Sequence, residues 1–334
     1  MHSPRRGRWA PTPSAPGAAE TAATLPGGPA PLDATAVDGG WLFTFRALGG
    51  PCEVRLDDAE PFPALRAQAE AAAAEVRRIE ARYSRYRADS LLSRINAAAG
   101  QAEPVAIDAE TAALLNFGAL LHAQSCGLFD LTSGVLRQAW DFRSGRLPTP
   151  ERIEAVRRHV GWDRVELGED SVRLTEPGME LDLGGIGKEY AADRAASALQ
   201  AAGLRHGWVN LAGDLRVLGP RLDGSPWQFG IQHPRDSAAL LASLPLADGA
   251  LATSGDYERF IEQGGRRYCH ILDPRSGWPV GQWRSVSVVA PTCTAAGALT
   301  TLAMLMGPEA LDLLRAQGVA FLAMDAQGQV HRSG

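Results

Sequence analysis

The chain has few cysteines and lacks both long apolar runs and basic clusters. Its 4 cysteines among 334 residues lie far apart and form no C-x-x-C pair, which favours buried thiols while leaving a zinc site or a disulfide open. No apolar stretch is long enough for a membrane-spanning helix. The 33 basic and 38 acidic side chains give a net charge of −5 without a basic cluster of the kind that binds nucleic acid. We therefore expect neither nucleic acid as a partner nor a membrane span.

The N-terminal segment also lacks large apolar residues. Residues 1–39 are rich in Pro, Ala, Gly and Thr, a composition that predicts a disordered leader followed by one domain over 40–334. Arg5, Arg6 and Arg8 precede prolines instead of the apolar segment of a signal peptide, and no lipobox cysteine follows. We expect a cytoplasmic protein, or a periplasmic one if an export signal or the true start lies upstream.

Apolar periodicity in the rest of the chain predicts helices interspersed with antiparallel strands. One helix face recurs at spacings of four and three and comprises Leu65, Ala69, Ala72, Val76, Ile79 and Tyr83. A second helix is expected over 108–125, an alternating strand over 227–231 and a hairpin over 319–330. With 45% hydrophobic residues the chain supports an ordinary core, and the pattern indicates an α+β fold in a single compact unit.

The segment LDLGGIGKEYAAD, residues 181–193, places reactive groups beside a backbone bend. We expect a short strand over 181–183 that ends in a carboxylate, a glycine-rich turn that permits positive φ and close backbone approach, and a helix that starts near Lys188 and ends at Gly203. A helix N-terminus beside a lysine suits a phosphate or pyrophosphate. The spacing fits neither G-x-G-x-x-G nor G-x-x-x-x-G-K-[ST], so a plain strand-to-helix connection stays open as the alternative.

A second polar segment surrounds His270. A strand is expected over 268–272, followed by a proline turn over 273–277, so that His270 stands at a strand end. Another polar turn is expected over 253–259, joined to this strand by a short hairpin at 264–265, which brings the two sets of polar groups together. A lone histidine beside apolar residues is more often structural than catalytic, and both interpretations stay open. Strand alternation directs Cys269 to the opposite face.

These segments, with others in the same order, resemble the ApbE-type FAD:protein FMN transferases, formerly called thiamine-biosynthesis lipoproteins. GLFDLT is similar to the family's G-x-F-D-[IP]-T, and HILDPRSG to its H-I-[IL]-D-P-x-[ST]-G. The matching blocks are 47–50, 84–86, 127–132, 182–193, 209–214, 253–257 and 270–277. Each block alone is a modest signal, but their common order makes the resemblance specific. It implies a T-fold-like core.

The resemblance also implies a phosphoryl transfer. In the family, a threonine or serine hydroxyl of a target protein attacks the FMN-side phosphorus of FAD, AMP leaves, and FMN stays attached as a phosphodiester. Mg²⁺ on the pyrophosphate neutralises the developing charge. The implied partners are therefore FAD, Mg²⁺ and a target protein with an acceptor threonine or serine, expected to be an electron-transfer protein.

A set of flavin-binding residues follows from the same resemblance. They are Leu48, Tyr86, Phe129, Asp130, Thr132, Asp182, Lys188, His270 and Ile271. Tyr86 offers an aromatic face, the carboxylates accept hydrogen bonds from ring, ribityl or ribose donors, and Lys188 supplies positive charge. Because an imidazole titrates near neutral pH, His270 is our candidate for the catalytic group that takes the proton of the target hydroxyl.

The implied metal site departs from the family pattern. Family members carry an aspartate and a threonine on the segment that here is AGALTT, with a backbone carbonyl as a further ligand. Thr301 keeps the hydroxyl and Gly185 supplies a carbonyl, but Gly297 stands in place of the aspartate, which predicts weaker magnesium binding. Where many members have glycine, Glu189 adds a negative charge to the first turn of the expected helix.

The missing aspartate leaves two outcomes open. In the first, the ion is held by the FAD pyrophosphate and water, with help from a carboxylate such as Asp256 or Asp214, and transfer proceeds. In the second, the protein is a non-catalytic FAD-binding paralogue. A third alternative is an FAD pyrophosphatase, in which water replaces the target hydroxyl and FMN and AMP are released.

Overall fold

A nine-stranded antiparallel sheet is the main feature of the computed structural model, which describes residues 31–333. The strand order is β1-β2-β3-β7-β8-β11-β14-β15-β16. These strands are β1 (Asp33–Val37), β2 (Gly40–Ala47), β3 (Gly50–Leu56), β7 (Gly207–Leu211), β8 (Asp214–Gly219), β11 (Gly249–Gly255), β14 (Trp283–Ala290), β15 (Ala320–Asp325) and β16 (Val330–Arg332). With helices interspersed along the chain, the architecture confirms the predicted α+β class.

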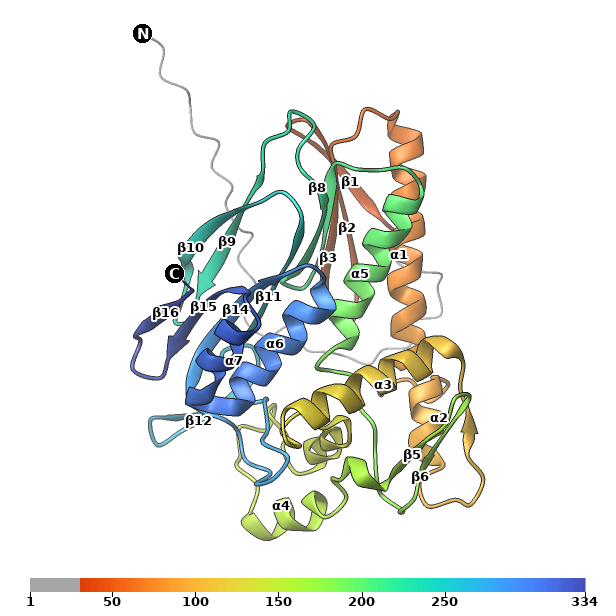
Figure 1. The fold of residues 1–334 in the computed structure, drawn as a ribbon, viewed down its shortest axis with the longest axis vertical. Coiled ribbons are helices and arrows are strands. Elements are labelled where there is room, and N and C mark those ends of the chain that lie inside the picture. Colours follow the sequence, from red (N-terminus) through yellow and green to blue (C-terminus); the bar gives the residue numbers. More distant parts are fainter. Residues whose placement is uncertain (1–30, 334) are drawn as a thin grey trace.

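Helices line one side of this sheet, and smaller sheets complete the fold (Figure 1). The helices are α1 (Phe62–Tyr83), α2 (Leu91–Ala97), α3 (Ala109–Gln124), α4 (Pro150–Arg157), α5 (Gly187–Ala201), α6 (Cys293–Met306) and α7 (Ala310–Ala316), with 3-10 turns η1 (Leu131–Gln138), η2 (Trp162–Arg164) and η3 (Gly307–Glu309). Two smaller sheets have two strands each: β9 (Trp227–His233) pairs with β10 (Asp236–Leu246), and β12 (Phe260–Gln263) pairs with β13 (Arg266–Cys269). A third has three strands, with β6 (Ser171–Leu174) between β4 (Val105–Ala106) and β5 (Val165–Leu167). None of the helices within 31–333 is long and apolar enough to cross a membrane.

The N-terminal boundary of the domain differs from the prediction. Strand β1 pairs with β2 from Asp33 to Val37, so a disordered leader reaching residue 39 is wrong for these residues. Composition misled the prediction because a short edge strand needs few large side chains when a neighbouring strand supplies its hydrogen bonds. The rest of the predicted leader, residues 1–30, lies outside the described residues.

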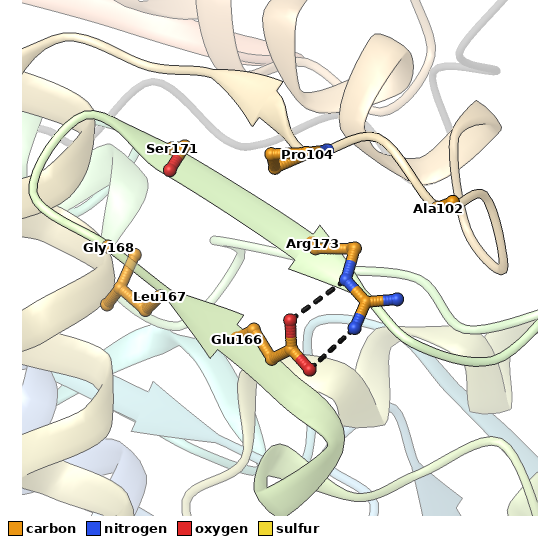
Figure 2. A pocket seen from close by; sticks show the side chains of 7 residues that line it. All are labelled: Ala102, Pro104, Glu166, Leu167, Gly168, Ser171 and Arg173. Atoms are coloured by element: carbon orange, nitrogen blue, oxygen red, sulfur yellow. Dashed lines mark hydrogen bonds and ion pairs between the residues drawn. The ribbon is translucent and has the colours of Figure 1, made fainter.

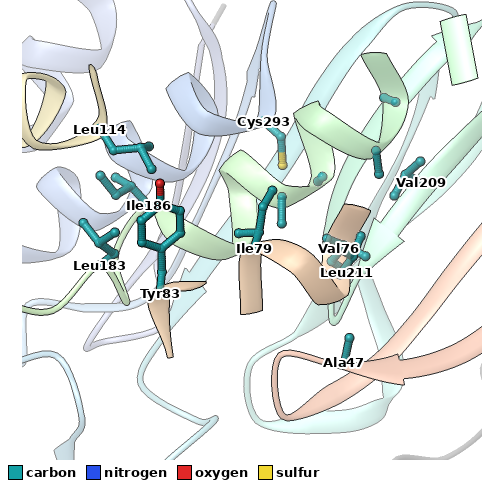
Figure 3. Packing of buried hydrophobic residues seen from close by; sticks show 14 of the residues in the cluster. Ala47, Val76, Ile79, Tyr83, Leu114, Leu183, Ile186, Val209, Leu211 and Cys293 are labelled. Carbon is teal, nitrogen blue, oxygen red and sulfur yellow. The ribbon is translucent and has the colours of Figure 1, made fainter. Parts of the chain in front are cut away.

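The main core lies between the sheet and the helices α1 and α5 (Figure 3). The apolar stripe predicted for the first helix is buried, each member being 8% exposed or less. In this core Tyr83 of the stripe lies beside Ile186 at the start of α5, and Val76 lies beside Leu211 of β7. The second predicted helix is α3, and the Asp108 side chain caps it by accepting a hydrogen bond from the backbone N–H of Thr111 at 3.0 Å.

Two predicted strands are shorter or absent. Residues 181–183 form no strand, because the Asn96 side chain replaces a strand partner: its amide donates to the Leu181 carbonyl at 3.0 Å and its oxygen accepts from the Leu181 N–H at 2.7 Å. The strand expected over 268–272 ends at Cys269, and Leu272 forms an isolated bridge with Pro279. The residues at 253–255, expected in a turn, belong to strand β11.

Two tight hairpin turns meet at one end of the sheet. Leu48 and Gly49 connect β2 to β3 with φ of 54° and 75°, and Ala212 and Gly213 connect β7 to β8 with φ of 50° and 103°. The turns lie side by side, because β3 pairs with β7 and the Ala212 N–H donates to the Pro51 carbonyl at 2.9 Å. Both turns therefore place one non-glycine residue in the left-handed region, where a side chain is unfavourable.

Relief of that strain is testable with Ala212→Gly. We expect the variant to gain up to about 1 kcal/mol of unfolding free energy, because glycine adopts left-handed φ without penalty. Urea titration followed by circular dichroism measures the change. The matched control, Ala71→Gly on the exposed face of α1, should lose about 1 kcal/mol instead. An equal loss at both positions would contradict the strain.

Candidate active site

The predicted glycine-rich turn leads into α5, as expected, but its glycines serve a different purpose. None of Gly184, Gly185 and Gly187 adopts a left-handed φ. The side chain of Asp182 instead shapes the turn by accepting a hydrogen bond from the Gly184 N–H at 2.9 Å. A Cβ on Gly185 would lie 3.1 Å from the ring of Phe129, so this glycine allows close packing. Of the two properties expected of these glycines, the structure uses close approach at Gly185 and not positive φ.

The two residues predicted to bind metal lie next to each other. A Cβ on Gly185 would lie 3.6 Å from Cγ2 of Thr301, although the two positions are far apart in sequence. Gly297 precedes Thr301 by one helical turn on α6 and therefore shares its face. The structure thus brings the start of α5 and one face of α6 together at a single place.

A buried carboxylate occupies the space in front of Gly297. A Cβ built on Gly297 would lie 2.3 Å from Cγ and 2.8 Å from Cδ of Glu189, the second residue of α5 after Gly187. Glu189 is 7% exposed, and its Oε2 has no hydrogen-bond partner within residues 31–333. Burial, and then the nearby charge of Asp214, raise the pKa of Glu189 well above its usual range, while Lys188 opposes the shift.

An ion pair stands beside this carboxylate. The ammonium group of Lys188 pairs with Asp214 of β8, which is 2% exposed. Burial alone would lower the pKa of Lys188, but Asp214 and then Glu189 raise it overall, so the lysine is charged at neutral pH. Asp256, the other carboxylate considered for the metal, instead accepts two hydrogen bonds of 2.6 Å from Arg235.

His270 follows β13 and is exposed, with its backbone N–H bonded to the Arg259 carbonyl at 2.9 Å. Desolvation by surrounding protein, and then the charge of Arg259, lower its pKa, and Lys188 and Arg85 contribute in the same direction. The shift favours the neutral form of the imidazole. Cys269 is fully buried, as strand alternation predicted.

The other predicted flavin residues differ in their contacts and in their exposure. Asp182 forms an ion pair with Arg85, whose guanidinium also stands 5.0 Å above the ring of Tyr86. Tyr86 is 63% exposed, so its aromatic face is accessible. Leu48 lies in the β2–β3 turn, where its N–H donates to Glu80 at 2.7 Å. Ile271 is partly buried against the core beneath α6.

Asp130 and Thr132 have internal partners. Asp130 caps η1 by accepting hydrogen bonds from the N–H and hydroxyl of Thr132 at 2.7 and 2.6 Å. Thr132 is fully buried, and its hydroxyl accepts from the Gly161 N–H at 2.7 Å. These bonds show a structural role for both residues, and their contact with flavin stays a prediction.

Comparison with known proteins identifies the family. The model of the ApbE family matches residues 48–323. The chain belongs to the ApbE family. Among its relatives, the FAD:protein FMN transferase of Vibrio cholerae is 34% identical over 68% of this chain and 69% of its own length. A Klebsiella pneumoniae relative of the same name is 30% identical over 92% of this chain and 88% of its own.

Solved ApbE structures show the same fold. The ApbE protein of Thermotoga maritima superposes with a TM-score of 0.80 and 32% identity, covering 88% of this chain and 97% of its own. The flavin transferase ApbE from Vibrio cholerae gives a TM-score of 0.78 at 26% identity, covering 91% of this chain and 98% of its own. These matches confirm the single ApbE-like fold implied by the sequence motifs.

Some residues of this ApbE site were missed from sequence. Arg85 lies in the matching block 84–86, but the sequence predicts no role for it; in the structure it pairs with Asp182. Ser254 and Thr300 were also missed: their hydroxyls bond at 2.9 Å, and Thr300 donates to the Gly297 carbonyl at 2.9 Å. The facing of Glu189 and Gly297 was missed as well, although both were noted separately as departures from the ApbE pattern.

A shallow hollow elsewhere on this ApbE fold holds none of the predicted residues. Figure 2 shows it beside the small sheet formed by β4, β5 and β6. Its charged side chains, Glu166 and Arg173, neutralise each other through hydrogen bonds of 2.6 and 2.8 Å. The chemistry therefore points to the α5–α6 site and not to this hollow.

The raised pKa of Glu189 predicts a pH-dependent stability. The folded protein holds this proton more tightly than the unfolded chain, so the stabilisation is full below the unfolded pKa of about 4.3 and is lost as pH rises. In metal-free buffer, the unfolding free energy of Glu189→Gln relative to wild type should therefore rise by up to about 1.4 kcal/mol per pH unit above about pH 5. Urea midpoints at several pH values measure the difference.

The control for this prediction is Glu110→Gln on α3. Arg78, and also Tyr190, lower the pKa of Glu110, so its stabilisation is present above the unfolded pKa and the control variant should be less stable than wild type near neutral pH. If the difference in unfolding free energy between Glu189→Gln and wild type stayed constant across this pH range, the pKa of Glu189 would be the same in the folded and unfolded chains.

Proposed function

We propose that this protein is an FAD:protein FMN transferase, which moves FMN from FAD to a threonine or serine hydroxyl of a target protein and releases AMP. The observation that supports this most is the meeting of the α5 N-terminus with α6, which places Gly185 beside Thr301 in an ApbE fold, three residues before the charged Lys188. The names of the ApbE relatives agree with this activity.

The proposed reaction breaks the bond between the FMN-side phosphorus and the oxygen that leaves with AMP. A bond forms between that phosphorus and the target hydroxyl oxygen, and the hydroxyl proton goes to His270. The lowered pKa of His270 keeps its ring unprotonated near neutral pH, so a nitrogen lone pair is available to accept the proton. Lys188 supplies a fixed positive charge close to the pyrophosphate, where negative charge develops.

Magnesium fits the residues present. Residues 31–333 contain no cluster of three or more His, Cys, Asp or Glu side chains placed to hold a metal, which disfavours a fully protein-held ion. Mg²⁺ prefers oxygen ligands and retains water, so the Gly185 carbonyl and the Thr301 hydroxyl, together with substrate phosphate, suit it. When bound, Mg²⁺ would neutralise charge on the pyrophosphate.

Product analysis tests the proposal against its alternatives. The purified protein is incubated with FAD, Mg²⁺ and a threonine-bearing target domain, and intact masses are recorded beside a magnesium-free control. Magnesium-dependent addition of one FMN to the target is the expected result. Free FMN and AMP without addition would indicate a pyrophosphatase, and bound, intact FAD would indicate the FAD-binding paralogue that Gly297 suggested.

Replacement of His270 tests its role. We expect His270→Ala to lower kcat for transfer by about 10²- to 10⁴-fold, as loss of a general base does, while FAD still binds. Single-turnover transfer and calorimetric FAD titration measure the two effects. The control is His159→Ala, which lies beyond the end of α4 and should transfer at the wild-type rate. Unchanged transfer by His270→Ala would remove the histidine from the mechanism.

The direction of the His270 shift predicts the pH profile. Because its pKa is lowered, the acid limb of kcat/KM attributable to His270 should lie below the ordinary value of about 6.5. Rates of transfer measured from about pH 5 to 8 locate this limb. A limb at or above pH ~6.5 that disappears in His270→Ala would contradict the lowered pKa.

A further inference from the structure

Glu189 and Gly297 face each other: many family members have glycine at the first position, and the family pattern has aspartate at the second. On α5 a glutamate replaces glycine, and on α6 a glycine replaces aspartate. We infer that Glu189 supplies the carboxylate of the divalent-cation site, in the space that a side chain at position 297 would fill. This inference rests on the proposed function and assigns the acidic ligand within that site.

The space is shared in a strict sense. A Cβ on Gly297 would lie 2.3 Å from Cγ of Glu189, so a side chain at position 297 would force Glu189 out of its present conformation. Cδ and Oε1 of Glu189 lie 2.8 and 3.0 Å from the same Cβ position, so the carboxylate also stands beside the α6 backbone. It therefore lies on the α6 face that one turn later presents Thr301.

The packing of the two helices fixes this juxtaposition. Asp193, one turn after Glu189 on α5, accepts hydrogen bonds of 2.8 Å from the backbone N–H groups of Cys293 and Thr294 at the start of α6. Cys293 precedes Gly297 by four residues. The pair 193 and 293 and the pair 189 and 297 are thus successive contacts between the same two helices, and the first sets the position of the second.

The Glu189 carboxylate has the character of a ligand. It is more than nine-tenths buried, and its Oε2 has no hydrogen-bond partner in the described part of the chain when the group is ionised, since only the protonated carboxyl group can donate to Asp214. The ammonium group of Lys188 pairs with Asp214. A divalent cation beside Gly185 and Thr301 would pair with the remaining oxygen and suit its charge.

Metal binding can be measured without the transfer reaction. Mn²⁺ is titrated into protein saturated with FAD, in the absence of a target protein, and free Mn²⁺ is followed by electron paramagnetic resonance. The variants are Glu189→Gln, Glu189→Gly, Gly297→Asp, and the double variant Glu189→Gly with Gly297→Asp. Glu110→Gln serves as the control, and thermal unfolding confirms that each variant is folded.

We expect Glu189→Gln and Glu189→Gly to raise the Kd for Mn²⁺ at least about tenfold, as loss of an anionic ligand does. The double variant should restore it to within about threefold of wild type, while Gly297→Asp alone should lower thermal stability because both side chains compete for one space. Glu110→Gln should bind like wild type.

Two results would overturn the inference. One is a Kd for Glu189→Gln equal to that of wild type, which would reduce Glu189 to a charge partner of Lys188. The other is a double variant that is folded but binds no better than Glu189→Gly. The Mn²⁺ titration contains no target protein, so its outcome does not depend on transfer. A failure of FMN transfer in the separate product analysis would disprove the proposed function and leave this inference to be judged by Mn²⁺ binding.

Discussion

The carboxylate of Asp193 fixes the position of α6 relative to α5, and the candidate site lies between these two helices. It binds the free N–H groups at the start of α6, where the helix dipole favours negative charge, and so ties α6 to the middle of α5. The Gly-rich turn lies at one end of α5, and the Thr301 face belongs to α6. If this tie shifted by one helical turn, Glu189 would no longer meet Gly297 and Gly185 would no longer meet Thr301.

Charge balance explains why so many ionisable groups lie together in a buried place. Lys188, Glu189 and Asp214 sit on adjacent elements with little exposure of the two carboxylates, and desolvation of an isolated charge there would be costly. One lysine offsets one carboxylate, and the second carboxyl group responds by holding its proton more tightly. A bound cation would stabilise the ionised carboxylate against both burial and the repulsion from Asp214, the two causes that raise the pKa of Glu189.

The sequence predicted much of the scaffold because local patterns determine it. The α1 stripe, the capped helix α3 and the hairpin of β15 and β16 follow from periodicity, caps and turn residues that lie within one segment. Predictions were wrong where a distant side chain decided the outcome, as when Asn96 replaced a strand partner at Leu181. The leader boundary was wrong because composition does not reveal that β2 accepts an edge strand.

The relation between Glu189 and Gly297 also constrains how such a site changes in evolution. Starting from this chain, an aspartate gained first at 297 competes with Glu189 for space, whereas a glycine gained first at 189 leaves neither position 189 nor position 297 with a carboxylate. Each single step crosses an unfavourable intermediate, so the two substitutions are epistatic. Moving the carboxylate from position 189 to position 297 therefore requires paired changes.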